Sequence, residues 1–179
     1  QLSILARLGS GSAARSITHG FIEWLLGERD DGMDSFAQAI DVTWRELCVG
    51  LCIFSTAPKK ISSSAGMQHT CNTSPLYPVW PQAATRDLDS LKLALATRDF
   101  KRLGEISEHN ALMMHATMMA ARPSLIYATA ETTAMMHHIW ELRQQGLEIY
   151  FTQDAGPNLK LLFEQHNEAI IKDHFDKVD

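Results

Sequence analysis

Alternating hydrophobic positions predict the strands of this chain. The clearest case is the stretch from Thr43 to Ser55, where both sets of alternate residues are apolar. One set is Leu47, Val49, Leu51 and Ile53, and the other is Cys48, Gly50, Cys52 and Phe54. A strand that is apolar on both sides is typical of the middle of a sheet, so we expect a central strand here. Shorter apolar stretches predict further strands at 21–26, 124–127 and 147–151.

Hydrophobic residues three or four positions apart predict the helices. This spacing predicts helices at about 84–97 and 100–119 and one more from Pro157 onward. Further helices are expected at about 62–73, where Ser62, Ser63 and Ser64 offer N-caps, and at 132–145. Pro157 suits a first helical position, and Gly146 suits the position just after a helix. Strands mixed with long helices favour an α+β domain built as a two-layer α/β sandwich.

Composition excludes several classes of protein. The 179 residues carry a net charge of -5, whereas nucleic-acid binders usually present a basic face, so we expect no nucleic-acid partner. The apolar stretches fall short of the ~18 residues that a membrane span needs, so we expect no membrane partner. Three cysteines without a disulfide-like spacing indicate a reducing compartment and a cytoplasmic protein. No zinc-ligand spacing is present, and we predict no protein-held metal.

A loop rich in glycine and serine is the first candidate site. Residues 9–16 read Gly-Ser-Gly-Ser-Ala-Ala-Arg-Ser. Glycines let backbone N–H groups approach an anion, and Ser10, Gly11 and Ser12 would supply such donors at the start of a short helix. Arg15 adds a forked donor that matches a carboxylate or phosphate. The alternative is an exposed flexible turn, and no Walker A lysine follows.

Two further candidates lie later in the chain. Asp154 follows a predicted strand, where α/β sheets place residues that contact ligands, although it could simply cap the turn or the next helix. Lys59 and Lys60 precede Ser62 and Ser63, so this stretch could hold a diphosphate or could be a solvated turn with an N-cap. The histidines and methionines of the helical stretches, His115 among them, are expected to pack or to lie on the surface.

Taken together, these segments resemble the mevalonate diphosphate decarboxylase family of the GHMP kinase superfamily. The matching stretches follow in order along almost the whole chain. They are 6–13 with Arg15 and Ser16, 20–24, 60–63, 66–68, 73–75, 110–116 and 152–158. The glycine–serine–arginine run and the Asp-Ala-Gly-Pro-Asn turn at 154–158 are specific in combination.

The resemblance implies a reaction and roles for residues. The reaction would be the ATP-dependent decarboxylation of mevalonate 5-diphosphate to isopentenyl diphosphate, with Mg²⁺ on the ATP phosphates, in a homodimer. Asp154 matches the catalytic aspartate beside the 3-hydroxyl, and Arg15 matches the arginine that orients the substrate carboxylate. Ser10, Gly11, Ser12, Ser62 and Ser63 match substrate or phosphate contacts. Alternatives are a kinase that stops after phosphorylation, a non-catalytic C-terminal fragment, and a small-molecule binding module.

Some features depart from the family pattern. His19-Gly20 stands where two glycines are usual, and Ser64 stands where Arg or Thr is common. The family's nucleotide-phosphate loop and its lysine have no counterpart in the sequence, and an apolar helical pattern is already under way at Leu2. We therefore expect residues 1–55 to be the end of an N-terminal GHMP domain and residues 56–179 to be the C-terminal domain, with further residues before Gln1 and beyond Asp179.

Overall fold

The computed structural model describes residues 2–175, and the chain divides into two compact units between Trp44 and Arg45. The sequence places this boundary later, between residues 55 and 56. The difference arises from the strand Leu47–Cys52, which pairs with the strand Leu159–Glu164 and therefore belongs to the second unit.

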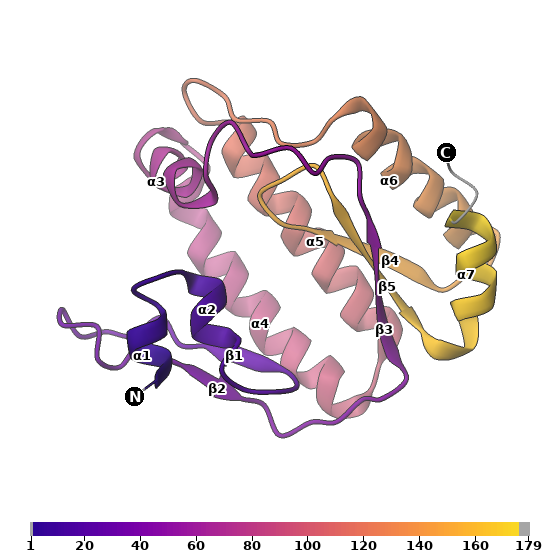
Figure 1. Cartoon of the computed structure of the whole chain (residues 1–179), viewed down its shortest axis with the longest axis horizontal. Helices are drawn as coiled ribbons and strands as arrows, with labels where there is room; N and C mark the ends of the chain where they lie inside the picture. Colours follow the sequence, from indigo (N-terminus) through magenta and orange to yellow (C-terminus); the bar gives the residue numbers. More distant parts are fainter. Residues whose placement is uncertain (1, 176–179) are drawn as a thin grey trace. The chain divides into compact units, whose positions relative to one another are not determined.

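Within residues 2–44, the first unit contains two short helices and a two-stranded sheet (Figure 1). Its elements are α1 (Leu2–Ala6), α2 (Gly11–Arg15), β1 (Ile22–Trp24) and β2 (Ala37–Ala39). The two strands are antiparallel, with Trp24 opposite Ala37. Buried Ser3 joins the elements, because its hydroxyl donates to the carbonyl of Ala14 at 2.9 Å and accepts from the N–H of Ala37 at 2.7 Å. The helix that the sequence predicts after the serine-rich loop and the strand at 21–26 are both present.

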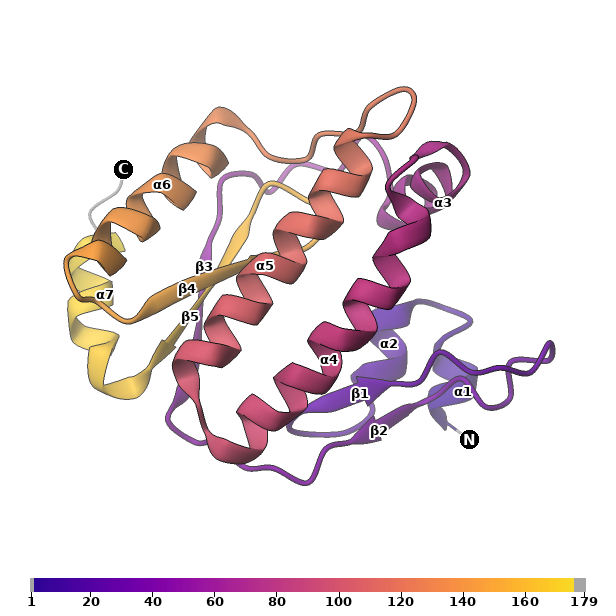
Figure 2. The same ribbon diagram turned by 180° about the vertical axis from the view of Figure 1, so that it is seen from behind.

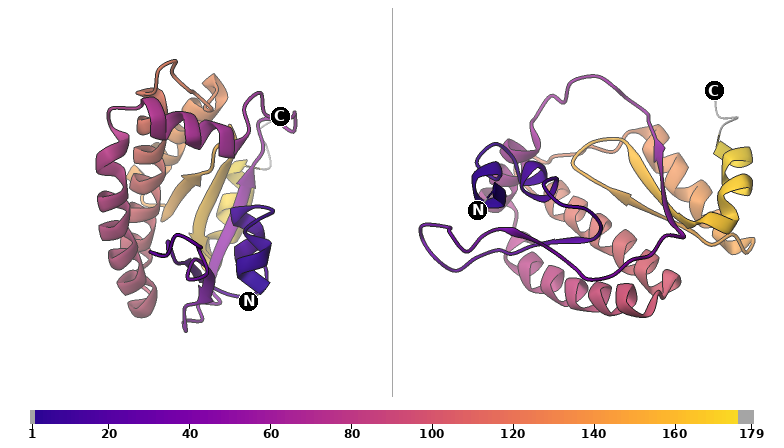
Figure 3. Two further views of the ribbon diagram at one scale, coloured as in Figure 1. Left: turned by 90° about the vertical axis from the view of Figure 1, so that its left-hand side faces the viewer. Right: turned by 60° about the horizontal axis from the view of Figure 1, so that its bottom comes forward.

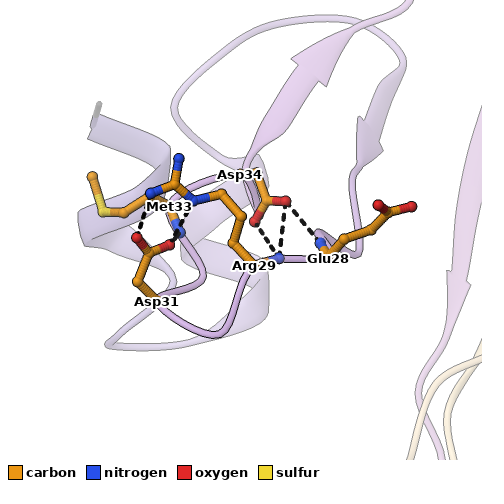
Figure 4. A network of polar contacts seen from close by, with 5 residues as sticks. All are labelled: Glu28, Arg29, Asp31, Met33 and Asp34. Carbon is orange, nitrogen blue, oxygen red and sulfur yellow. Dashed lines mark hydrogen bonds and ion pairs between the residues drawn. The ribbon is translucent and has the colours of Figure 1, made fainter.

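Two aspartates organise the charged loop between β1 and β2 (Figure 4). The carboxylate of Asp34 accepts from the backbone N–H groups of Glu28 and Arg29, and Asp31 accepts from the Arg29 guanidinium and the N–H of Met33. These hydrogen bonds hold the pKa of both carboxyl groups below the usual range, with Arg29 as the main cause at Asp31 and the Glu28 N–H at Asp34. Asp31 is exposed and Asp34 is half-buried, so the network shapes a surface loop.

The second unit combines a three-stranded antiparallel sheet with five α-helices among the described residues. Its strands are β3 (Leu47–Cys52), β4 (Ile149–Gln153) and β5 (Leu159–Glu164), in the order β3-β5-β4. Its helices are α3 (Ser63–Thr73), α4 (Trp80–Thr97), α5 (Phe100–Met119), α6 (Ala130–Gln144) and α7 (Glu168–Phe175), with short 3₁₀ turns η1 (Tyr77–Val79) and η2 (Gln165–Asn167). This arrangement confirms the predicted α+β class.

Helices cover both sides of β4. Residues of α6 and α7 form one apolar cluster with the sheet, in which Ile139, Ile149, Phe151 and Leu159 are fully buried. On the other side, the ring of Tyr150 packs against Gly104 of α5, where no larger residue fits. Helices α4 and α5 run side by side (Figures 2 and 3). Buried Glu108 of α5 joins these parts by accepting from Trp140 at 2.7 Å and from Arg143 at 2.6 Å.

Three predictions of local structure are wrong. β3 is an edge strand, because β5 takes the central place, and Leu51 is 66% exposed within the described chain. Residues 159–164 form strand β5 and not a helix, and the helix that follows begins at Glu168. Residues 124–127 form no strand. Helix α4 begins at Trp80, earlier than expected, because Pro81 lies in its first turn, where a missing N–H costs nothing.

Candidate functional site

The turn at residues 154–158 joins β4 to β5 and is held in place from several directions. Buried Gln153 donates to the carbonyl of Gly156 at 2.8 Å, and the Thr132 hydroxyl donates to the carbonyl of Pro157 at 2.7 Å. The side chain of Asn158 accepts from the N–H of Phe54 at 2.8 Å, which ties the turn to the segment after β3. The backbone around Asp154 is therefore fixed by its neighbours.

His115 supports the same turn from α5. Its Nε2–H donates to the carbonyl oxygen of Asp154 at 3.2 Å, and its ring lies edge-to-face with Tyr127. Burial lowers the pKa of His115, and the hydrogen bonds to the backbone of Asp154 and Gln153 partly oppose this shift. Folding therefore favours the neutral form of this ring relative to the unfolded chain. The expected packing role of His115 is thus confirmed, with a polar contact to the candidate site in addition.

The carboxylate of Asp154 points out of the turn and forms an ion pair with Lys160 through Oδ2. Its side chain is 78% exposed. The alternative that Asp154 caps the next helix is wrong, because the next element is strand β5. A carboxylate that is fixed by its backbone and open to solvent can accept a hydrogen bond or a proton from a bound molecule.

A cavity of about 440 Å³ lies beside this carboxylate. Lys59, Asp154, Asn158 and Lys160 line it, together with the apolar side chains of Leu51 and Ile53. Lys59 donates to the hydroxyl of Ser63 at 3.2 Å. The ammonium group of Lys59 at an open cavity favours an anionic ligand, and the exposed carboxylate of Asp154 can accept a hydrogen bond from it.

Ser62 and Ser63, at the start of α3, were expected either to cap the helix or to contact a diphosphate, and they have different surroundings. Ser62 is the N-cap, since its Oγ accepts from the N–H of Ala65 at 3.2 Å. Ser63 is exposed and joined to Lys59, one of the residues that line the cavity. The structure therefore brings Lys59, Ser63 and Asp154 to one region of the second unit, and Ser62 holds the helix start beside them.

The serine-rich loop lies in the first unit. Ser10 is the N-cap of α2: its Oγ accepts from the N–H of Ala13 at 3.0 Å and lies 3.1 Å from Oγ of Ser12. Gly11 leaves room for the ring of Trp24, and the guanidinium of Arg15 lies over the same ring at 5.7 Å from its centroid. Four of the predicted site residues thus share one short helix and its cap, and their approach to Asp154 stays a prediction.

The cavity offers little protein chemistry for a bound metal. Asp154 is the one acidic residue among those that line it, and Lys160 already pairs with this carboxylate. Mg²⁺ commonly binds through one or two carboxylates together with substrate phosphates, so these residues fit a metal that arrives with a polyphosphate. Separately, Glu148, Glu164 and His166 place one ligand atom each within 4.8 Å of one another.

Sequence reasoning missed Lys160 and the roles of His115 and Asn158. Lys160 was hidden by the expected helix from Pro157. Leu159, Lys160 and Leu161 also fit the alternating pattern of a strand. A strand at this position places the lysine opposite Thr152, near the end of β4. The contacts of His115 and Asn158 join residues that are distant in sequence, and no local pattern reveals them.

Comparison with known proteins gives a consistent result. The family "Mevalonate 5-diphosphate decarboxylase C-terminal domain" matches residues 49–178, and "Diphosphomevalonate decarboxylase-like N-terminal domain" matches residues 1–37. A diphosphomevalonate decarboxylase from Debaryomyces hansenii is 30% identical over 99% of this chain and 48% of its own length.

No helix in the described part of the chain is long and apolar enough to cross a membrane.

Solved structures agree. Mevalonate diphosphate decarboxylase from Staphylococcus aureus is 40% identical with a TM-score of 0.90, over 99% of this chain and 54% of that one. A complex described as MDDEF with MVAPP, AMPPCP and magnesium is 41% identical with a TM-score of 0.90, over 98% of this chain and 55% of that one. The present chain therefore spans about half the length of the relatives it matches.

Proposed function

This chain belongs to the mevalonate 5-diphosphate decarboxylase family, and from that premise we propose that its protein converts mevalonate 5-diphosphate to isopentenyl diphosphate with ATP and Mg²⁺. The observation that supports the proposal best is the open carboxylate of Asp154 beside a cavity lined by Lys59 and Lys160. The solved relative with MVAPP, AMPPCP and magnesium supports the choice of substrate, nucleotide and metal.

Asp154 would accept the proton of the 3-hydroxyl. A carboxylate is too weak a base to ionise an alcohol beforehand. It can orient the hydroxyl and take its proton late, while the oxygen–phosphorus bond forms and ADP leaves. The C1–C2 bond then breaks, its electron pair forms the C2–C3 double bond, and the C3–O bond breaks to release phosphate and CO₂.

Arg15 would position the substrate carboxylate. Decarboxylation needs electrons to flow from C1 toward C3, so an arginine that neutralised the carboxylate strongly would oppose the reaction. Holding the C1–C2 bond in line with the breaking C3–O bond is the more useful role. Ser10, Gly11, Ser12, Ser62 and Ser63 are proposed contacts to substrate or phosphates. Mg²⁺ would neutralise phosphate charge when bound, and this chain would contribute Asp154 near it.

We propose further that the protein is a cytoplasmic homodimer. Three free cysteines support a reducing compartment. We also keep the expected domain assignment as a proposal, with the boundary moved to the junction of Trp44 and Arg45, where the chain divides into two units.

The experiment that tests the role of the site is the substitution Asp154→Asn in the protein at its natural length. The amide keeps the shape but cannot accept a proton. Turnover should fall by roughly 10²–10⁴-fold, the usual range for a positioned general base, while KM for mevalonate 5-diphosphate changes much less. Equal losses in binding and turnover would contradict the catalytic role and assign Asp154 to the structure of the turn.

A further inference from the structure

We propose that Lys160 is a positioning residue for Asp154, an inference that rests on the proposed function. Lys160 would hold the Asp154 carboxylate in the orientation in which one oxygen faces the substrate hydroxyl. Lys160 would act through Asp154 and would not contact the substrate itself.

The backbone of Lys160 is fixed more firmly than that of a loop residue. Lys160 lies in β5, the central strand of the sheet, between Leu51 of β3 and Thr152 of β4. Its side chain is 37% exposed, so much of its stem is covered. Asp154, by contrast, follows the last residue of β4, and its side chain is 78% exposed. Both backbones are held in place, and the less exposed side chain of Lys160 is the more restricted of the two.

The ion pair gives the two carboxylate oxygens of Asp154 different roles. Lys160 contacts Oδ2 of Asp154. Within residues 2–175, no hydrogen bond or ion pair involves Oδ1, and both residues line the same cavity. Holding Oδ2 restricts rotation of the carboxylate and leaves Oδ1 as the oxygen that can accept the hydroxyl proton.

Stability alone does not account for this pair. Exposed ion pairs contribute little to folding, because solvent screens the charges and two long side chains lose freedom. Restricting the orientation of a general base has a larger effect on turnover, since a misplacement of ~1 Å in a catalytic group can cost about 10²-fold. The pair therefore matters for catalysis more than for folding.

The test measures kcat and KM in the protein at its natural length, with mevalonate 5-diphosphate, ATP and Mg²⁺. The variant Lys160→Met removes the charge but keeps most of the stem, and Lys160→Arg keeps a cation. Lys101→Met is the matched control, because it breaks an exposed ion pair with Glu105 on α5. We expect Lys160→Met to lower kcat by about 10–10²-fold with KM little changed, Lys160→Arg to recover most of the loss, and the control to match the wild type.

The double variant Asp154→Asn/Lys160→Met shows whether the lysine acts through the aspartate. We expect its kcat to equal that of Asp154→Asn alone, because nothing remains for Lys160 to orient. A further loss of kcat in the double variant would overturn the inference, and so would a normal kcat in Lys160→Met. If the wild type is active, the proposed function stands in either case. A wild type that releases no CO₂ would overturn the proposed function and this inference with it.

Discussion

The side-chain amide of Asn158 forms two reciprocal hydrogen bonds with the backbone of Ser55. Its Oδ1 accepts from the N–H of Ser55 at 3.1 Å, and its Nδ2 donates to the carbonyl of Ser55 at 3.0 Å. The two residues are 103 positions apart in sequence. An amide has both a donor and an acceptor, so it satisfies both backbone groups of Ser55 at once. The contact fixes the Asp154 turn to the segment that precedes α3.

Replacing this amide should weaken the fold. Asn158→Ala leaves partly buried backbone groups of Phe54 and Ser55 without partners, which costs roughly 1–3 kcal/mol in the free energy of unfolding. Urea denaturation of the variant measures this loss. Asn72→Ala is the control, because Asn72 forms an exposed contact with Gln68, and its effect should stay within about 0.5 kcal/mol. Equal effects of the two substitutions would show that the Asn158 contact does not stabilise the turn.

The stability of the fold should depend on pH through His115. Burial lowers the pKa of this ring, so the unfolded state binds more protons below its ordinary pKa of about 6.5. The contribution of the neutral ring is complete above that pH. It is lost as the pH falls through about 6.5 toward the lower pKa of the folded state.

The measurement for His115 is the free energy of unfolding of wild type and His115→Gln at about pH 8 and about pH 5.5. The difference between the two proteins isolates this histidine from the other seven of the eight in the chain. We expect the wild type to lose more stability on acidification than the variant. An identical loss in both proteins would show that the protonation of His115 is not linked to folding.

Arg15 should matter more than an exposed cation does. Loss of an exposed ion pair costs about 0.2–1 kcal/mol, which corresponds to at most about a fivefold change. Arg15→Ala should lower turnover by more than about tenfold, because the orientation of the substrate carboxylate is lost with the charge. Arg29→Ala is the control within the same unit, since Arg29 is exposed and paired with Asp31. Similar kcat values for the two variants would remove the positioning role from Arg15.

Local patterns predicted the elements whose signals lie within the element itself. The N-cap serine Ser62 predicted helix α3, and Gly146, with its φ of 99°, marked the end of α6. Residues 159–164 were misassigned, because Leu159, Leu162 and Phe163 fit a helical stripe as well as a strand. The pairing of Leu159 with both Cys52 and Gln153 decides in favour of the strand, and this is a tertiary effect.

The candidate site likewise combines features that local sequence predicts with features that depend on tertiary contacts. Asp154 and the serine–arginine run were proposed as site residues from short stretches of sequence, since glycine and serine at a helix start and a carboxylate after a strand suit contacts to a ligand. The ion pair with Lys160 depends on β5 being a strand. The hydrogen bonds of Asn158 depend on Phe54 and Ser55, which are far away in sequence. Each needs the folded sheet to bring the partners together.

The most direct test of the proposed function is the stoichiometry of the products. The protein at its natural length is given ATP, Mg²⁺ and mevalonate 5-diphosphate labelled at C1, and labelled CO₂, phosphate and ADP are measured over time. A decarboxylase breaks the C1–C2 bond each time that phosphate leaves C3, so we predict that all three products form in equal amounts. ADP formed without CO₂, together with a stable 3-phosphorylated product, would contradict decarboxylation and show that the protein is a kinase.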